Sequence, residues 1–363
     1  MLLKPLIIMA GGTGGHVFPA LAVAVYLRTQ GVPVVWLGSR RGLESRLVPQ
    51  HNFRLLSVDA AALRGSGWRG WLLAPVRILV SLVQAMGWLL QVRPGAVLGM
   101  GGFASGAGGL AAWLLRIPVL IHEQNALAGL TNRILYPFAR VVMQGFPATF
   151  PAQPKVRCVG NPVRAEISSL PVPDQRGIGQ GSGPLRILVL GGSQGARALN
   201  AAVPATLALP GATPALNVLH QCGPAHQADT ESAYKRVTNG HAVRVVPFIE
   251  DMAGAYAQAD LVLCRAGALT LAELCAAGIG AILVPFPHAA DDHQRANAQH
   301  LAGQGAAVLL PEAELNPARL ADLIRELNAD RKRLLAMAMA ARSLSKPDAT
   351  RDVGRICMEV LSA

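Results

Sequence analysis

Two glycine-rich turns of the same kind occur about half a chain apart. Residues 6–16 read LIIMAGGTGGH and residues 187–196 read ILVLGGSQGA. Each follows a short apolar run typical of a buried strand and leads into an Ala/Leu-rich helical pattern. A strand that ends in glycines and opens a helix presents backbone N–H groups at the positive end of a helix dipole, which suits phosphate. Two such turns indicate two Rossmann-like halves with a phosphorylated ligand between them.

Polar side chains follow the expected strands of the first half at places where they could reach a ligand. His16 comes directly after the first turn, at the start of the expected helix. A helix N-terminus lowers the basicity of an imidazole, so a neutral histidine there can take a proton or donate to phosphate. The alternative is a helix residue that only bonds the backbone. The run His122-Glu123-Gln124-Asn125 follows the apolar segment IPVLI and so lies at the carboxyl end of a strand, where doubly wound sheets bind ligands.

Two polar segments of the second half have comparable positions. Residues 264–270, CRAGALT, end one expected strand and open a helix that carries Glu273. Glu273 is either a partner of the helix dipole or a ligand for ribose hydroxyls. Residues 291–294, DDHQ, have side chains that can bind a metal, cap the next helix or recognise sugar hydroxyls.

Several common ligand classes do not fit the sequence. GGTGGH has no third glycine in the G-x-G-x-x-G frame, and the second expected strand ends at Ser39, where a dinucleotide site wants a carboxylate. No lysine follows a glycine, which excludes a Walker A site. The five cysteines lack CxxC spacing, which argues against a zinc site or a disulfide framework. A diphosphate ligand without P-loop chemistry remains, and a nucleotide sugar fits that description.

Positive charge is concentrated in the first half of the chain. Residues 1–163 hold 15 lysines and arginines against three acidic residues, and the remainder is neutral. This asymmetry indicates an anionic partner, either nucleic acid, an acidic membrane surface or a charged substrate. Nucleic acid is the weakest of these, because the sequence has no zinc-finger spacing, no RNP-like motif and no dense basic helix.

An apolar segment in the same half is a candidate for membrane contact. Residues 75–93 read PVRILVSLVQAMGWLLQVR, and the run between Arg77 and Arg93 has 15 residues, short of the roughly 20 that span a bilayer. Its polar residues Ser81, Gln84 and Gln91 fall on one narrow stripe of a helix. A core helix and an interfacial helix are both consistent with this pattern. The interfacial reading is favoured by the neighbouring Arg64, Trp68, Arg69 and Trp71 and would place Leu79, Leu82 and Met86 against lipid.

The alternation of apolar runs and helical patterns predicts an α/β fold of two Rossmann-like domains with parallel sheets, divided near residue 163. Strands are expected at 6–10, 33–37, 96–99, 118–121, 140–143, 185–190, 216–220, 243–247, 260–264 and 281–284. Helices are expected at 18–30, 106–115, 196–208, 268–277, 293–303, 317–342 and 349–361. The Pro/Gly-rich residues 170–184 are expected to form a flexible connection. Lys4 and Pro5 lead directly into the first strand, so we expect no signal peptide.

Seven motifs in order along the chain carry a resemblance to a known family. They read MAGGTGGHVFPALA, GMGGFASGAGGLAA, PVLIHEQNALAGLTNR, GNPVR, LGGSQGARALN, RAGALTLAEL and DDHQRANA. With PDAT at 347–350, they resemble the peptidoglycan N-acetylglucosaminyltransferase family, MurG. The resemblance implies a GT-B fold, in which two domains face one another across a cleft. Residues 1–163 would be the acceptor- and membrane-associated domain and residues 164–345 the UDP-GlcNAc-binding domain, with a C-terminal helix in 346–363 packing back on the first.

The resemblance also implies a set of site residues. In the second domain, Ser193 would meet the diphosphate, Ile249 the uracil, Glu273 the ribose, and Ala268, Leu269 and Thr270 the phosphates. Either His293 or Gln294 would read the GlcNAc hydroxyls. The first domain and the hinge would contribute Thr13, Gly14, Gly15, His16, Asn125 and Arg164. Phe103 stands where some members of the family carry tyrosine.

The reaction that the resemblance implies is an inverting transfer of GlcNAc from UDP-GlcNAc to the 4-hydroxyl of MurNAc in lipid I, giving lipid II. It would take place at the cytoplasmic face of the inner membrane, with the enzyme bound peripherally to anionic lipid and near other cell-wall synthesis proteins. Backbone N–H groups would stabilise the leaving diphosphate without a metal or cofactor. His16 is the first choice as general base and Glu123 the alternative. Other readings are a different GT-B nucleotide-sugar enzyme acting on a glycolipid, and a non-catalytic UDP-sugar-binding scaffold.

Overall fold

The computed structural model describes residues 4–40, 42–59, 74–181, 183–211, 213–235, 237 and 240–363. The chain forms two compact units. The first consists of Met1–Val163 and Pro347–Ala363, and the second of Arg164–Lys346. Each unit has its own parallel sheet and its own apolar core, so each is described by itself.

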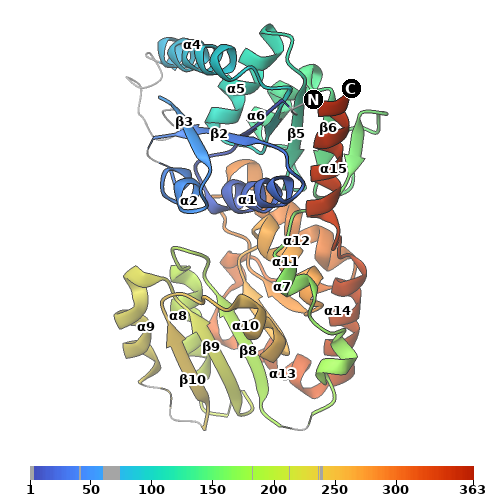
Figure 1. The fold of residues 1–363 in the computed structure, drawn as a ribbon. Helices are drawn as coiled ribbons and strands as arrows, with labels where there is room; N and C mark the ends of the chain where they lie inside the picture. Colours follow the sequence, from blue (N-terminus) through green and yellow to red (C-terminus); the bar gives the residue numbers. More distant parts are fainter. Residues whose placement is uncertain are drawn as a thin grey trace. The chain divides into compact units, whose positions relative to one another are not determined.

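The first unit is built on a parallel sheet with the strand order β3-β2-β1-β4-β5-β6-β7. Figure 1 labels β2, β3, β5 and β6 of this sheet. Its strands are β1 (Leu6–Met9), β2 (Val34–Ser39), β3 (Arg54–Val58), β4 (Ala96–Gly99), β5 (Val119–Glu123), β6 (Val141–Gln144) and β7 (Val156–Cys158). Its helices include α1 (Gly14–Thr29), α2 (Glu44–Gln50), α4 (Ala74–Val92), α5 (Phe103–Leu114), α6 (Leu130–Leu135) and α15 (Ala349–Ser362). The central strand β1 is wholly buried because helices cover both faces of the sheet, which explains its uninterrupted apolar sequence. Helix α15, at the C-terminal end of the chain, packs against α1 in this unit.

The second unit repeats the plan with the strand order β10-β9-β8-β11-β12-β13. Its strands are β8 (Leu185–Leu190), β9 (Leu216–Gln221), β10 (Ala242–Val246), β11 (Leu261–Cys264), β12 (Ala281–Leu283) and β13 (Ala307–Leu309). Its helices include α7 (Ala165–Ser168), α8 (Arg197–Leu207), α9 (Gln227–Tyr234), α10 (Met252–Gln258), α11 (Ala268–Ala277), α12 (His293–Gly303), α13 (Pro317–Ala329) and α14 (Arg331–Ser343).

The strand order reverses beside the first strand of each sheet, between β1 and β4 and between β8 and β11. In doubly wound sheets, ligands bind at the carboxyl ends of the strands at such a switch point. The turns after β1 and β8 are the two glycine-rich turns that the sequence singles out. The topology therefore places both turns where a Rossmann-like unit binds its ligand.

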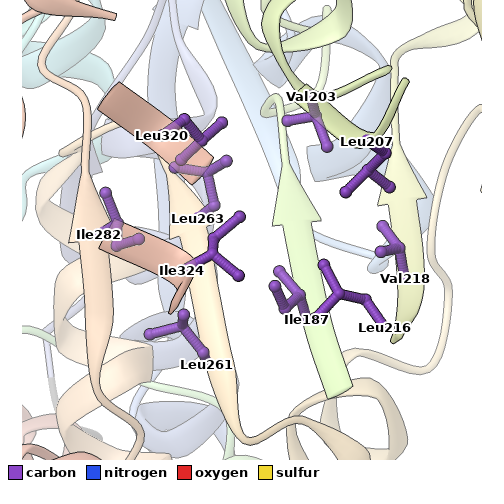
Figure 2. A pocket seen from close by; sticks show the side chains of 10 residues that line it. All are labelled: Ile187, Val203, Leu207, Leu216, Val218, Leu261, Leu263, Ile282, Leu320 and Ile324. Atoms are coloured by element: carbon purple, nitrogen blue, oxygen red, sulfur yellow. The ribbon is translucent and has the colours of Figure 1, made fainter. Parts of the chain in front are cut away.

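The sheet of the second unit encloses a small cavity that carries no site. Figure 2 shows that its lining side chains are all aliphatic and come from the four central strands and from α8 and α13. The cavity measures about 10 Å³, which is the size of one water molecule, and no lining side chain offers a hydrogen bond. It is a packing gap of the core.

The structure corrects several expectations about secondary structure. The short strands β3, β7 and β13 lie at or next to sheet edges and were not expected. The single helix expected at 317–342 is two helices, because the chain turns at Asp330, whose carboxylate accepts the Arg333 N–H and caps α14. The expected flexible connection at 170–184 includes a 3₁₀ turn at Pro173–Arg176, and its Ile178 is buried in the core of the second unit. Arg176 in this segment also donates to the carbonyls of Ala277 and Gly278 at the end of α11.

Candidate active site

In the first unit, His16 lies between two glycine-rich turns. The turn after β1 leads through Gly11 and Gly12 into α1, and His16 Nδ1 is 3.4 Å from the Gly11 carbonyl oxygen. A Cβ atom on Gly101 would approach His16 Nε2 to 2.9 Å, so the imidazole lies directly against the turn that follows β4. Gly102 has a φ of +86°, and a Cβ there would meet the Gly11 carbonyl oxygen at 2.5 Å. Both positions require glycine, because the two turns touch at the switch point.

Most of the other residues predicted for the first unit surround this point. Thr13 is the N-cap of α1 and is exposed, and its carbonyl accepts the His16 N–H. Gly14 and Gly15 form the first turn of α1. Phe103 begins α5, directly after the turn that carries Gly101.

The polar run after β5 is mainly a structural frame. The Glu123 carboxylate is 3 % exposed and accepts four hydrogen bonds, from the backbone N–H groups of Asn125 and Gly129 and from the side-chain amides of Asn125 and Asn132. His122 is fully buried, and burial lowers the pKa of its imidazole. Asn125 is partly exposed, so the frame holds this side chain at the surface of the unit.

In the second unit, the turn after β8 leads into α8 and leaves part of its backbone exposed. Gly192, Ser193 and Gln194 are exposed. Gly195 has a φ of +79°, and a Cβ there would collide with the Cys222 carbonyl oxygen after β9. The Gln221 side-chain amide donates to the Gly192 carbonyl at 2.8 Å. The side chain of Gln221, at the end of β9, therefore supports the turn by bonding one of its carbonyl groups.

Glu273 on α11 is the charged centre of this unit's switch point. Its carboxylate accepts hydrogen bonds from Arg164 Nη2 at 2.9 Å and from the Tyr256 hydroxyl at 3.1 Å. Tyr256 is fully buried, and burial together with the adjacent Glu273 raises its pKa well above the usual range. Gly267 caps α11, so Ala268, Leu269 and Thr270 form its first turn, one helical turn before Glu273. A neutral tyrosine and a cation thus orient the carboxylate.

The DDHQ segment opens α12. Asp292 is the N-cap in a left-handed conformation with φ +54° and makes no side-chain capping bond. Gln294 Oε1 accepts the N–H groups of Ala266 and Phe286, which joins α12 to the turn before α11. His293 Nδ1 is 2.6 Å from the Ala290 carbonyl oxygen. Within the described residues, no cluster of side chains is suited to a metal ion.

Ile249 lies after β10, next to the exposed Phe248. Three residues that the sequence did not single out bond to the site: Tyr256 to Glu273, Gln221 to Gly192, and Glu44 to Gly12. Gln221 could have been found from the sequence, because it is a polar side chain at the end of a strand, as residues 122–125 are. Tyr256 lies within helix α10, and no such sequence pattern marks it. Glu44 is one of only three acidic residues before residue 164.

Helix α4 presents an apolar surface, but not with the orientation expected from its polar stripe. Ser81 and Gln84 face β3, where both bond to Asp59. The exposed side is apolar and includes Val76, Leu79, Val80, Val83 and Leu90. Of the three residues expected to face lipid, Leu79 lies on the exposed side, whereas Leu82 and Met86 are partly buried and pack against the core of the unit.

By length and composition alone, α4 could cross a membrane, in contrast to the expectation from the run between the two arginines. Its packing against α5 and β3 makes it part of the first unit's fold. Arg64, Trp68, Arg69 and Trp71 lie outside the described residues.

Comparison with known proteins places this arrangement in a family. Residues 6–144 match the glycosyltransferase family 28 N-terminal domain, and residues 186–353 match the C-terminal domain of the same family. The chain is 56 % identical over 355 residues to the UDP-N-acetylglucosamine–N-acetylmuramyl-(pentapeptide) pyrophosphoryl-undecaprenol N-acetylglucosamine transferase of Alkalilimnicola ehrlichii, covering 98 % of both chains.

Solved structures agree with these matches. A crystal structure of Acinetobacter baumannii MurG is 43 % identical with a TM-score of 0.86, covering 98 % of this chain and 99 % of that one. The calicheamicin glycosyltransferase matches over 99 % of this chain and 98 % of its own, with a TM-score of 0.69 and 17 % identity, and so shares the fold alone. The two parallel-sheet units are those of the GT-B fold, and the chain belongs to the MurG family of N-acetylglucosaminyltransferases within glycosyltransferase family 28.

Proposed function

We propose that this chain transfers GlcNAc from UDP-GlcNAc to the 4-hydroxyl of MurNAc in lipid I, with inversion, giving lipid II. Family membership and the activity for which relatives above 50 % identity are named support this reaction. The observation that carries it is the oriented Glu273 carboxylate beside the N-terminus of α11 in the second unit. A carboxylate suits ribose hydroxyls, and a helix N-terminus suits a diphosphate.

In this proposal, the donor binds mainly to the second unit. The exposed turn at Ser193 and the first turn of α11, Ala268–Thr270, bind the diphosphate and stabilise the charge that develops as UDP leaves. Glu273 holds the ribose, and Arg164, now paired with Glu273, completes the donor site. Ile249 contacts the uracil through its backbone. His293 and Gln294 contact the sugar, and Gln294 has its amide oxygen engaged by two backbone N–H groups, so it would use its NH₂ group.

His16 is the general base of the proposed reaction. The acceptor hydroxyl must lose a proton as it attacks the anomeric carbon, and a partly exposed imidazole at the switch point of the first unit suits this role. Glu123, the alternative, is less suited, because its buried carboxylate already accepts four hydrogen bonds. Thr13, Gly14, Gly15 and Asn125 would position the acceptor.

The first unit would carry the membrane contact, with peripheral binding at the cytoplasmic face of the inner membrane. It combines the basic residues 1–163 with the exposed apolar side of α4. Anionic lipid attracts the charge, and the apolar side chains can enter the headgroup region. Lipid I is anchored in the same bilayer, so the acceptor sugar would be presented to this unit.

Transfer of radiolabelled GlcNAc to defined acceptors tests the reaction. Purified protein is given labelled UDP-GlcNAc with lipid I, with other glycolipids, or with no acceptor. We expect label only in the lipid I product, joined by a β-linkage. Transfer to another glycolipid alone would support a different GT-B enzyme. Binding of UDP-GlcNAc without any transfer would support a scaffold and reject the proposal.

A further inference from the structure

The first glycine-rich turn is built around a buried carboxylate. Glu44, the first residue of α2, is 0 % exposed. Its Oε2 accepts the Gly12 N–H at 3.0 Å, and its Oε1 accepts the backbone N–H and the hydroxyl of Ser39 at 2.9 and 2.6 Å. One carboxylate thus joins the turn after β1 to the end of β2.

Glycines give this carboxylate its space. A Cβ on Gly11 would lie 2.5 Å from Glu44 Oε1, and a Cβ on Gly38 would lie 2.8 Å from Glu44 Cγ. A Cβ on Gly42 would overlap the same carboxylate. Three glycines from the β1 turn, from β2 and from the loop before α2 therefore surround Glu44. Their absence of side chains allows it to approach the backbone of the turn.

The position of this carboxylate has a particular meaning in a Rossmann-like unit. In a dinucleotide site, an acidic residue at the end of the second strand binds ribose, while the N–H groups of the glycine turn face the pyrophosphate. In this chain, the carboxylate at that place binds the turn itself. The Gly12 N–H already donates to the Glu44 carboxylate, so a substrate phosphate could accept a hydrogen bond from it only by displacing Glu44.

Glu44 is connected to His16 through the first glycine-rich turn. Glu44 accepts the Gly12 N–H. The carbonyl oxygen of the neighbouring Gly11 lies next to His16 Nδ1 and against Gly102. His16 in turn lies against Gly101. A shift of the turn would move the imidazole relative to both of its neighbours. A misplacement of about 1 Å in a catalytic group can cost roughly 100-fold in rate.

We propose that Glu44 is a positioning residue, which acts as a built-in anion for the first glycine-rich turn and thereby places His16 for proton transfer. This inference rests on the proposed function, because it assigns Glu44 an effect on the same reaction. Glu44 touches no reacting atom. It acts through the turn, so its removal is expected to lower turnover and to leave the donor site of the second unit unchanged.

The test uses Glu44→Gln, which keeps size and shape but replaces one acceptor oxygen with a donor. We expect kcat for the full-length enzyme to fall about 10- to 100-fold, while KM for UDP-GlcNAc and calorimetric UDP affinity stay within twofold. Glu359→Gln, the same change at an exposed residue of α15 in the same unit, is the matched control and should keep full kcat. In the His16→Ala background, Glu44→Gln should cause little further loss, because both changes act on one group.

Amide NMR of protein labelled with ¹⁵N-glycine supplies a signature that does not depend on activity. The Gly12 N–H, bonded to a carboxylate, should resonate downfield and move upfield in Glu44→Gln, whereas glycines of the second unit should not move. Thermal unfolding monitors folding in parallel. A wild-type kcat in a folded Glu44→Gln protein, or a loss of equal size in the His16→Ala background, overturns the positioning role. Failure of the wild-type enzyme itself to transfer GlcNAc would instead overturn the proposed function.

Discussion

In the first unit, the turn after β1 donates its Gly12 N–H to the buried Glu44 carboxylate. In the second unit, the turn after β8 receives the Gln221 amide on the Gly192 carbonyl, and Gly192, Ser193 and Gln194 are exposed. Both turns come from the same strand–glycine–helix pattern and lie at equivalent switch points. The first therefore resembles an anion site that the protein has filled, and the second a site that is open to a diphosphate. The shared motif leads the backbone of both turns from a strand into a helix, and the side chains that pack around each turn decide what it can bind.

The largest expected effect is that of removing His16, the general base proposed beside the first turn. His16→Ala should lower kcat about 100- to 10,000-fold, as is typical for loss of a general base, with little change in KM for UDP-GlcNAc. Steady-state kinetics with lipid I measures this, and the exposed His51 supplies a control as His51→Ala. Activity within a few-fold of wild type would reduce His16 to a structural residue, and the two turns would no longer differ in catalytic role.

The donor role of the second unit is tested at its charged centre. Glu273→Ala should weaken UDP binding by about 10- to 150-fold, because charge-assisted hydrogen bonds are worth roughly 1.5–3 kcal/mol. Tyr256→Phe removes one of the two groups that orient the carboxylate and should cause a smaller loss, about 5-fold. Isothermal calorimetry compares both with wild type. Unchanged UDP affinity in Glu273→Ala would rule out the ribose role.

A pH-dependent effect tests the support behind the second turn. His220 bonds to Asn200 and Tyr234, and burial lowers its pKa from 6.5 to about 4. Because the unfolded chain binds the proton more readily, the stability from neutral His220 is complete above pH 6.5 and is lost as pH falls towards 4. The loss should be about 2 kcal/mol at pH 5.

The measurement is urea unfolding of wild type and of His220→Gln at pH 7 and pH 5. The variant lacks the titrating group, so the difference in unfolding free energy between the two proteins should shrink at the lower pH. A difference that is the same at both pH values would contradict the prediction. Other titrating groups cancel, since both proteins carry them.

The smallest expected effect concerns the surface of the first unit. Changing Val76, Leu79 and Val83 to Ser should weaken binding to vesicles with anionic lipid by about tenfold, and salt should weaken it further. Met339→Ser, an exposed change on α14 of the second unit, serves as control. Leu82→Ser should instead lower the melting temperature, because Leu82 packs against the core. Vesicle binding that responds to neither salt nor the triple change would refute a membrane surface on α4.

The sequence predicts those features that depend on residues close together in the chain. Continuous apolar runs identify the central strands, and β4, β8, α11 and α12 have the bounds expected for them. The edge strands β7 and β13 have three residues each, too few for a pattern. Of the polar stripe on α4, Ser81 and Gln84 bond to Asp59, whereas Gln91 is exposed. The direction in which Ser81 and Gln84 face therefore depends on Asp59, which is distant in the chain.

The contacts of Glu44 could not be inferred from the sequence. The second expected strand ends at Ser39 without a carboxylate, which disfavours a dinucleotide site. The carboxylate nevertheless reaches the end of that strand from the next helix, because Gly38 and Gly42 leave room for it. Such an arrangement needs contacts among three separate segments, which no local pattern encodes.

The sequence by itself determined the two-unit α/β plan, the two turns and the family, because these follow from apolar periodicity, glycine placement and motifs that are contiguous in the chain. The tertiary structure alone decided which groups meet: Glu44 with Gly12, His16 with Gly101, and Glu273 with Arg164 and Tyr256. The physical reason is that hydrogen bonds and charge pairs act over a few ångströms in space. Whether a side chain serves as ligand, base or support is therefore set by neighbours that packing brings from distant parts of the chain.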